Sequence, residues 1–236
     1  MDFRVVHIDE TDSTNHWLWE NGVGDMVVVA DYQTTGRGCG TNTWESARGK
    51  NLLFSVLLHP QDIPANRQFL VSEAVSVALC EALEQYAAPM EIKWPNDIYY
   101  GEKKLCGILI EHRLQGNVIK DSVVGIGINV NQEVFVSDAP NPVSLRQIVG
   151  HEIDRERLLH AFLQILPEAL QRERLAADYR QRLFRREGLH RYEDAVGGFE
   201  ATIDDVLEDG RLQLVDADGH QRIYAFKEVK FIIESQ

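Results

Sequence analysis

The chain has 236 residues, enough for one large domain and a small one, and 44% of them are hydrophobic, which supports a real core. Its 24 lysines and arginines against 37 aspartates and glutamates give a net charge of −13, which argues against nonspecific nucleic-acid binding. No apolar run reaches membrane-spanning length and no N-terminal segment resembles a signal peptide, so we expect no membrane association.

Two polar segments flank the first predicted strand. Residues 12–15 precede Trp17, and each of them suits the cap of a helix. The apolar run 26–30 predicts a strand that leads into a glycine-rich loop, residues 32–44, with a single arginine. Glycines expose backbone N–H groups, and Arg37 offers a planar fork of donors, so the loop suits a carboxylate or a phosphate. It lacks the Walker and dinucleotide-binding spacings, and the alternative is an ordinary loop.

The middle of the chain predicts a strand at 52–58 and a helix at 66–86, where apolar residues recur at three- and four-residue steps. The sequence Lys93-Trp94-Pro95-Asn96-Asp97 follows. Pro95 fixes its own φ and biases the preceding residue towards an extended shape, so a strand should end at Lys93. Another strand is predicted at 105–111.

Lys93 and Lys104 are therefore expected near the ends of neighbouring strands, pointing into one site. Two cations with the Asp97 carboxylate suit a reaction that handles a polyphosphate and then an amine. The alternative is a hairpin with solvated charges.

The run 123–130 predicts a further strand that carries glycine at alternate positions and Asn129 near its end. Such glycines weaken a strand unless something packs closely against it, and an asparagine can pair with a base edge through donor and acceptor together. The alternative is a strand with a bulge.

The last third predicts helix and then strands. Residues 154–186 have a helical pattern, which Pro167 should kink or split. The pattern changes near residue 188, and three short alternating strands separated by Asp/Gly turns follow, at 198–203, 210–215 and 223–226. We therefore divide the chain into residues 1–187 and 188–236.

Cysteine and histidine give no sign of a metal centre. Cys39, Cys80 and Cys106 have neither metal-ligand spacing nor an even disulfide framework, and the eight histidines form no ligand pair. This usage favours the reducing cytoplasm.

These motifs, in this order, resemble those of the biotin protein ligases. The resemblance runs from about residue 5 to residue 130 and continues more weakly to the end. It is carried by Ser13-Thr14-Asn15, Gly36-Arg37-Gly38 with Trp44, Lys93 to Asp97, Lys104 with Gly107, and Gly127-Ile128-Asn129. It implies an α+β fold: a class II synthetase-like catalytic domain with a central mixed sheet and flanking helices, plus a small C-terminal SH3-like β domain.

The resemblance implies a two-step reaction. The biotin carboxylate attacks the α-phosphate of ATP, and the amine of a lysine on a biotin carboxyl carrier protein domain then displaces AMP from biotinyl-adenylate. Mg²⁺ is expected through the ATP phosphates, without side-chain ligands of its own. Some relatives dimerise through the sheet edge, and nothing in this sequence decides whether the chain does.

Roles follow by similarity for three overlapping sets of residues. The implied biotin-binding residues are Ser13, Thr14, Asn15, Gln33, Gly36, Arg37, Gly38, Cys39, Lys104 and Gly107. The implied ATP-binding residues are Trp44, Lys93, Asn96 and Asn129. The implied catalytic residues are Lys104, Asp97, Arg37 and Lys93.

The glycine-rich loop departs from the family pattern. Much of the family has further basic or polar donors after Gly-Arg-Gly, whereas here Cys39 and Gly40 follow. The loop therefore keeps one arginine, and we expect it to hold the adenylate with fewer charge-assisted bonds.

Three alternatives stay open. A lipoate or octanoate ligase shares the fold class but not the Gly-Arg-Gly loop with Lys-Trp-Pro-Asn-Asp. A non-catalytic biotin-binding protein has no need of Lys93, Asp97 and Lys104. A biotin-responsive repressor would carry a helix-turn-helix before Ser13, where this sequence has no room for one.

Overall fold

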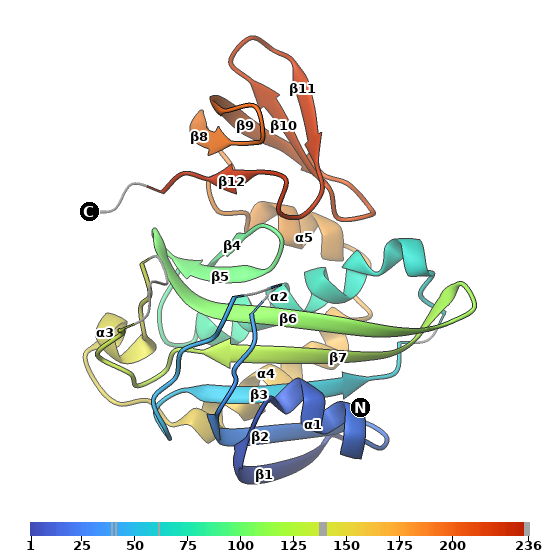
Figure 1. Ribbon diagram of the computed structural model, residues 1–236, viewed down its shortest axis with the longest axis vertical. Helices are drawn as coiled ribbons and strands as arrows, with labels where there is room; N and C mark the ends of the chain where they lie inside the picture. Colours follow the sequence, from blue (N-terminus) through green and yellow to red (C-terminus); the bar gives the residue numbers. More distant parts are fainter. Residues whose placement is uncertain (39, 41, 61, 137–140, 234–236) are drawn as a thin grey trace.

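The computed structural model describes residues 1–38, 40, 42–60, 62–136 and 141–233. Two sheets organise the chain, a large one below and a small one above in Figure 1. The large sheet is mixed, with β1 and β2 parallel and the remaining neighbours antiparallel. Its strands, in sheet order, are β1 (Arg4–Thr11), β2 (Met26–Gln33), β3 (Leu52–Leu58), β7 (Val118–Ile128), β6 (Lys103–Gln115), β5 (Asp97–Tyr100) and β4 (Glu91–Lys93).

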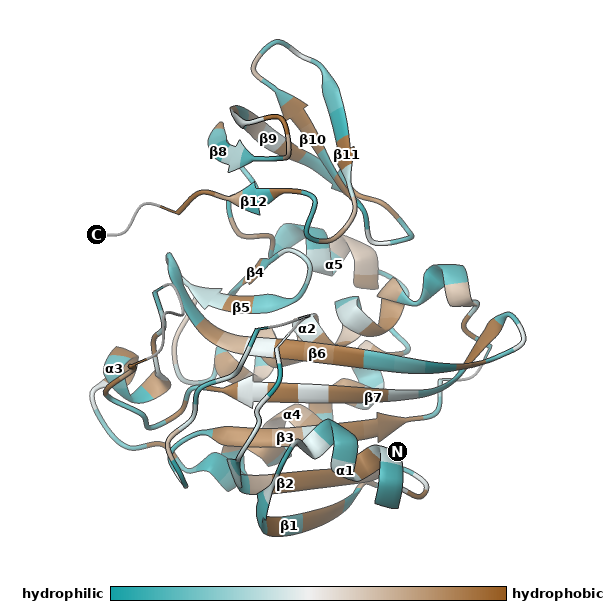
Figure 2. Ribbon diagram, viewed as in Figure 1, coloured by the Kyte–Doolittle hydropathy of each residue, from teal (hydrophilic) through white to brown (hydrophobic). Residues whose placement is uncertain are grey.

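The core lies between this sheet and two long helices behind it (Figure 1). All seven residues of β3 are buried, as are thirteen of the fifteen residues of α2 (Phe69–Leu83). A strand covered on both faces is a continuous apolar run, and Figure 2 shows β3 and β7 hydrophobic along most of their length. The second long helix, α4 (Arg155–Ala169), contributes Phe162, whose ring meets that of Phe54 edge-on at 5.6 Å.

The predicted helices are present with changed boundaries. The helix predicted at 66–86 is a 3₁₀ turn at Ala65–Arg67 followed by α2. The region 154–186 is split, but not at its proline: α4 continues past Pro167 to Ala169, and α5 (Leu175–Gln181) follows. Two shorter helices, α1 (Thr14–Asn21) and α3 (Leu145–Val149), complete the set in the described part of the chain.

The small sheet is antiparallel and takes residues from the last fifth of the chain. Its order is β11 (Gln221–Tyr224), β10 (Leu212–Asp216), β9 (Gly198–Val206), β8 (His190–Glu193) and β12 (Lys230–Phe231). The three predicted strands correspond to β9, β10 and β11, whereas β8 and β12 were not predicted. The predicted α+β class, with a central mixed sheet, flanking helices and a C-terminal β unit, is confirmed.

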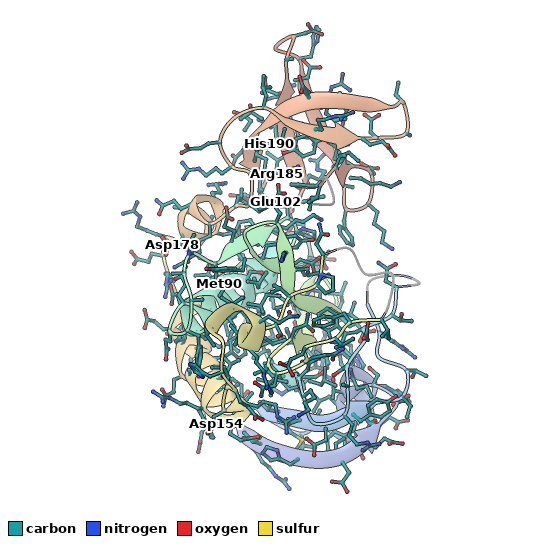
Figure 3. All side chains as sticks on the ribbon, turned by 90° about the vertical axis from the view of Figure 1, so that its left-hand side faces the viewer. Met90, Glu102, Asp154, Asp178, Arg185 and His190 are labelled. Carbon is teal, nitrogen blue, oxygen red and sulfur yellow. The ribbon has the colours of Figure 1, made fainter. Side chains whose placement is uncertain are left out.

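Polar contacts fix the region between the two sheets. Arg185 Nη2 donates to Glu102 Oε1 over 2.9 Å, and Figure 3 shows the two residues adjacent between the sheets. On α5, Arg180 pairs with Asp205 at 2.5 Å. None of the described helices is both long and apolar enough to cross a membrane.

Candidate active site

A cavity of about 700 Å³ opens beside the large sheet, where the β2–β3 connection crosses the face opposite α2 and α4 (Figure 1). Most of the predicted site residues line it: Ser13, Thr14, Asn15, Gln33, Arg37, Gly38, Trp44, Lys93, Asn96, Asp97, Lys104, Gly107 and Asn129. Gly36 is buried and does not line it, and Cys39 lies outside the described residues. Residues far apart in the chain thus meet in one cavity.

One part of the cavity is a buried polar cluster at the start of α1. Gln33 Oε1 accepts hydrogen bonds from the Thr14 backbone N–H (2.8 Å) and from Thr14 Oγ1 (3.0 Å). Ser55 Oγ lies 2.7 Å from both Thr14 Oγ1 and Asn15 Oδ1. Ser13 is the N-cap of α1, yet its side chain makes no capping bond. The Ser13 hydroxyl therefore does not cap the helix, although the sequence is compatible with that role.

Asn15 is held by the sheet as well as by Ser55. Its Nδ2 donates to Leu109 O (3.2 Å) and to Glu111 Oε2 (2.8 Å), both on β6. Since its amide oxygen faces Ser55, both ends of the Asn15 side chain are engaged within the protein. Asn15 therefore fixes the polar cluster against the sheet.

An ion pair occupies another part of the cavity. Lys104 Nζ donates to Asp97 Oδ2 over 2.6 Å, and both side chains are 26% exposed. The Lys104 backbone is clamped by Asn141 and Val143, whose segment leads into α3. Lys93 lines the same cavity, and burial lowers the pKa of its ammonium, with Asp97 acting in the opposite direction.

Lys93 and Lys104 line one cavity, as predicted. The prediction that they lie on neighbouring strands is wrong. Lys93 ends β4 and Lys104 begins β6, and β5 lies between them. The short turn 94–96 folds β5 back on β4, so that Asp97 pairs in register with Lys93. The order of strands therefore puts Asp97 between the two cations.

The Trp-Pro turn is anchored from outside the large sheet. Trp94 is 4% exposed, and its Nε1 donates to Gly210 O over 2.9 Å. Tyr179 Oη on α5 donates to Pro95 O over 2.6 Å. These two bonds fix the turn that carries Asn96 and Asp97 into the cavity.

Trp44 lies against the glycine wall of the cavity. A Cβ atom at Gly107 would come within 2.7 Å of the indole, and one at Gly127 within 2.5 Å. The room that these glycines leave is therefore taken by the Trp44 ring. Lys104 Nζ lies 5.7 Å from the ring centroid.

Two buried polar atoms of this wall have no hydrogen-bond partner, the Trp44 Nε1 donor and the Asn129 Oδ1 acceptor. The Asn129 backbone makes two hydrogen bonds: its N–H donates to Leu105 O, and its carbonyl oxygen accepts from the Leu145 N–H. Buried polar atoms are nearly always satisfied, so an orphaned donor and acceptor in a cavity point to a polar ligand.

The glycine-rich segment forms a narrow hairpin. Gly38 N–H donates to Asn42 O (2.8 Å) and Trp44 N–H to Gly36 O (2.9 Å). Arg37 lies in the hairpin with an exposed side chain and lines the cavity. An exposed guanidinium beside a cavity is available to an anionic ligand.

Carboxylates in the cavity are already engaged. Asp97 pairs with Lys104, and Glu45 accepts from Gln132 Nε2 and from the Val136 N–H. Among the described residues, a group with metal-binding geometry occurs at Asp216, Asp218 and His220, which belong to the small sheet and its β10–β11 turn.

Sequence reasoning missed several residues that build the site. Ser55 is the single polar residue of the buried strand β3, and a lone serine in an apolar run gives no local sign that it supports a site. Glu111, Tyr179 and Gly210 act through contacts between distant segments, which spacing along the chain does not encode. Phe226 of the small sheet's β11–β12 turn also lines the cavity.

Sequence comparison finds one matching family model and several related ligases. The sequence model of the Biotin/lipoate A/B protein ligase family matches residues 5–129. The Bifunctional ligase/repressor BirA of Bacillus subtilis is 36% identical over 163 residues, covering 66% of this chain and 49% of that protein. The Biotin–[acetyl-CoA-carboxylase] ligase of Mycobacterium tuberculosis is 31% identical, covering 74% of this chain and 69% of that protein.

A solved structure is similar over nearly the whole chain. The biotin protein ligase from Aquifex aeolicus in complex with biotin and ATP superposes with a TM-score of 0.81 at 27% identity, covering 97% of this chain and 99% of that one. The chain spans about half the length of the first curated relatives that it matches.

Proposed function

The chain belongs to the biotin/lipoate A/B protein ligase family, and on that premise we propose that it joins biotin to a carrier lysine at the expense of ATP. The observation that carries the proposal is that one cavity holds both the Thr14–Gln33 polar cluster and the Lys104–Asp97 ion pair. The first suits a polar head group and the second a carboxylate that must meet a phosphate.

The polar cluster favours biotin over lipoate. A ureido group has two N–H donors and a carbonyl acceptor, and the Ser13 hydroxyl, Thr14 and Gln33 offer complementary groups in a buried setting. A dithiolane ring makes no such bonds and would leave buried polar groups unpaired, which is how a polar site rejects an apolar ligand. Lipoate is therefore the weaker candidate substrate.

The first step joins two anions, and the cavity supplies cations for it. An oxygen of the biotin carboxylate attacks the α-phosphorus of ATP, a new P–O bond forms, and the bond to pyrophosphate breaks. Lys104 neutralises the carboxylate and the bridging oxygen, while Lys93 and Arg37 contact phosphate oxygens. Mg²⁺ bound to the phosphates would supply further positive charge, and the engagement of Asp97 and Glu45 within the protein supports that route.

Adenine recognition is assigned to Asn129 and Trp44. The orphaned Asn129 Oδ1 suits the exocyclic amine of adenine, and the indole of Trp44 offers an aromatic surface and an N–H donor. The buried atoms that lack partners within the protein thereby gain them from the nucleotide.

The second step needs a base, and Asp97 is the carboxylate in position for it. The carrier lysine loses a proton, its amine attacks the acyl carbon, and the C–O bond to AMP breaks. Asp97 accepts the proton from an amine whose ordinary pKa is about 10.4, and afterwards returns to its pair with Lys104.

The partner under this proposal is a carrier domain of a biotin-dependent carboxylase, and the compartment is the cytoplasm. Cys80 and Cys106 are both buried free thiols, as a reducing compartment permits. The test is to incubate the protein with Mg²⁺, ATP, biotin and a carrier domain. We expect ATP-dependent mass gain at one carrier lysine and pyrophosphate release that requires biotin. Pyrophosphate release with lipoate but not biotin would overturn the choice of substrate.

A further inference from the structure

A carboxylate outside the cavity holds one side chain of the polar cluster. Glu111 lies on β6, and its Oε2 accepts hydrogen bonds from Asn15 Nδ2 (2.8 Å) and from Trp19 Nε1 (3.4 Å). Leu109 O accepts from the same Asn15 nitrogen over 3.2 Å. Asn15 is 3% exposed, so these protein contacts, and not bulk water, decide how its amide lies.

The neighbours of Asn15 permit a single orientation of its amide. A carboxylate and a backbone carbonyl are both acceptors, so the group that faces Glu111 and Leu109 must be the NH2 group. The amide oxygen then points the other way and lies 2.7 Å from Ser55 Oγ. Gly125 leaves the room for it, since a Cβ atom there would overlap Asn15 Oδ1. Asn15 thus presents an acceptor to Ser55.

The orientation of this amide decides where the Ser55 proton goes. The Ser55 hydroxyl is buried and has one proton for two oxygens at 2.7 Å, Asn15 Oδ1 and Thr14 Oγ1. In the described part of the chain Asn15 Oδ1 has no other donor, so Ser55 donates to it. Thr14 donates its own proton to Gln33 Oε1, 3.0 Å away. The Thr14 oxygen therefore receives no proton from Ser55.

The opposite orientation of Asn15 would reverse this chain of bonds. An NH2 group facing Ser55 would donate to the Ser55 oxygen, and the Ser55 proton would then go to Thr14 Oγ1. Both hydroxyl oxygens would have a donor within the protein. The orientation that Glu111 imposes instead leaves Thr14 Oγ1 an unused acceptor, and Thr14 lines the cavity. Buried acceptors are nearly always satisfied, so this one favours a ligand that brings a donor.

We propose that Glu111 is a positioning residue for substrate selection: through Asn15 and Ser55 it reserves the Thr14 hydroxyl oxygen for an N–H group of the bound acid. The proposal rests on the proposed function in taking biotin, whose ureido ring carries two N–H groups, as the ligand. A dithiolane ring has no N–H group and gains nothing from a reserved acceptor.

Binding of biotin and of two analogues tests this role without ATP or carrier. The analogues are the two cyclic carbamates in which one ureido N–H of biotin is replaced by a ring oxygen. The exchange removes one donor and keeps the shape of the ring. For one of the two analogues we expect a Kd about tenfold or more above that of biotin, because Thr14 Oγ1 then faces a second acceptor. The ratio of these two Kd values is the selectivity ratio.

Substitutions at Glu111 should change the selectivity ratio according to the acceptor that they leave. Glu111→Leu removes the acceptor, and we expect the ratio to fall by about threefold or more. Glu111→Met repeats this loss with an unbranched side chain, so that a fold defect of one variant does not decide the test. Glu111→Gln should keep the ratio, because both donors meet the same oxygen, Oε2, and one amide oxygen can serve both.

Two further variants separate this role from a structural one. Trp19→Phe removes the other donor to Glu111 and leaves the bond to Asn15, so it should not change the ratio. Ser55→Ala removes the proton that Asn15 directs, so Glu111→Leu should have no effect on the ratio in that background. An unchanged ratio in Glu111→Leu and Glu111→Met, or an equal fall of the ratio with and without Ser55, would overturn the proposal.

The outcomes also separate this proposal from the proposed function. Carrier biotinylation by the wild type, together with an unchanged ratio in Glu111→Leu and Glu111→Met, would overturn the role of Glu111 alone. A ratio that depends on Glu111, without any biotinylation of a carrier by the wild type, would overturn the ligase activity alone.

Discussion

Lys104 Nζ and Asp97 Oδ2 lie 2.6 Å apart, and Asp97 directly follows the turn 94–96, which is held by Tyr179 of α5 and by Gly210 between β9 and β10. In this state the carboxylate neutralises the ammonium. Under the proposed function, a substrate carboxylate that arrives in the cavity would compete for the same ammonium and release Asp97 to act on a proton. The ion pair would then link the step that needs a cation to the step that needs a base.

Lys104→Ala should abolish most adenylate formation. The lysine is expected to stabilise charge that develops as the carboxylate meets the α-phosphate, and one such donor is worth on the order of 2.7–4 kcal/mol. We expect pyrophosphate release to fall by about a hundredfold or more. The matched control is Lys103→Ala, because Lys103 is exposed on the same strand and does not line the cavity. Near-normal pyrophosphate release by Lys104→Ala would contradict the role.

Ser55→Ala should weaken biotin binding. Ser55 Oγ lies 2.7 Å from both Thr14 Oγ1 and Asn15 Oδ1, so its loss unpairs buried polar atoms that orient the cluster. One such loss costs about 1–3 kcal/mol, and we expect the biotin KM to rise by about tenfold. Ser76→Ala is the control, because Ser76 is fully buried and its hydroxyl has no partner. An equal effect of both substitutions would show that the Ser55 contacts do not matter.

The sequence was sufficient to identify the motifs of the site, but not the residues that hold those motifs in place. Local patterns marked β2, β3, β6 and β7, because buried strands are continuous apolar runs, and Gln33, Lys104 and Asn129 lie at or next to the ends of three of these strands. Ser55 is a single hydroxyl within such a run, and nothing local distinguishes it from a tolerated serine. The bonds from Trp94 to Gly210 and from Tyr179 to Pro95 join segments 116 and 84 residues apart. Only the folded arrangement brings these partners together.

One prediction about geometry is wrong and another is displaced. Lys93 and Lys104 were expected on neighbouring strands, but the residues between them form β5. The helical region that contains Pro167 is split, but the split lies two residues after Pro167, where α4 ends. Local rules describe a single segment, whereas strand order and helix ends depend on neighbouring elements.

Asn129→Leu should weaken nucleotide binding without loss of stability. Its Oδ1 is buried without a partner, so the substitution of an apolar side chain of similar size removes an unsatisfied acceptor. We expect the ATP KM to rise by about tenfold and Tm to stay equal or increase, as measured by steady-state kinetics and thermal unfolding. A lower Tm with an unchanged ATP KM would show that Asn129 is structural.

Glu73→Gln should stabilise the protein in a pH-dependent way. Burial raises the pKa of the Glu73 carboxyl from 4.5 to about 7, with Arg180 acting in the opposite direction. Below about pH 4.5 the carboxyl is protonated in both the folded and the unfolded state. As the pH rises to about 7, the unfolded state ionises first, and the folded state loses up to about 3 kcal/mol relative to it.

The glutamine variant does not ionise and avoids this penalty. Its Tm advantage over the wild type should therefore be larger at pH 8 than at pH 5. The same Tm difference at both pH values would contradict the assignment of a raised pKa to Glu73.

Mass spectrometry of a carrier domain tests the central claim most directly. The carrier is incubated with the protein, Mg²⁺ and ATP, and with either biotin or lipoate. The account predicts that one carrier lysine gains the mass of a biotinyl group, that the gain requires ATP, and that lipoate gives none. Labelling by lipoate but not by biotin, or an unchanged carrier mass with both acids, would contradict it.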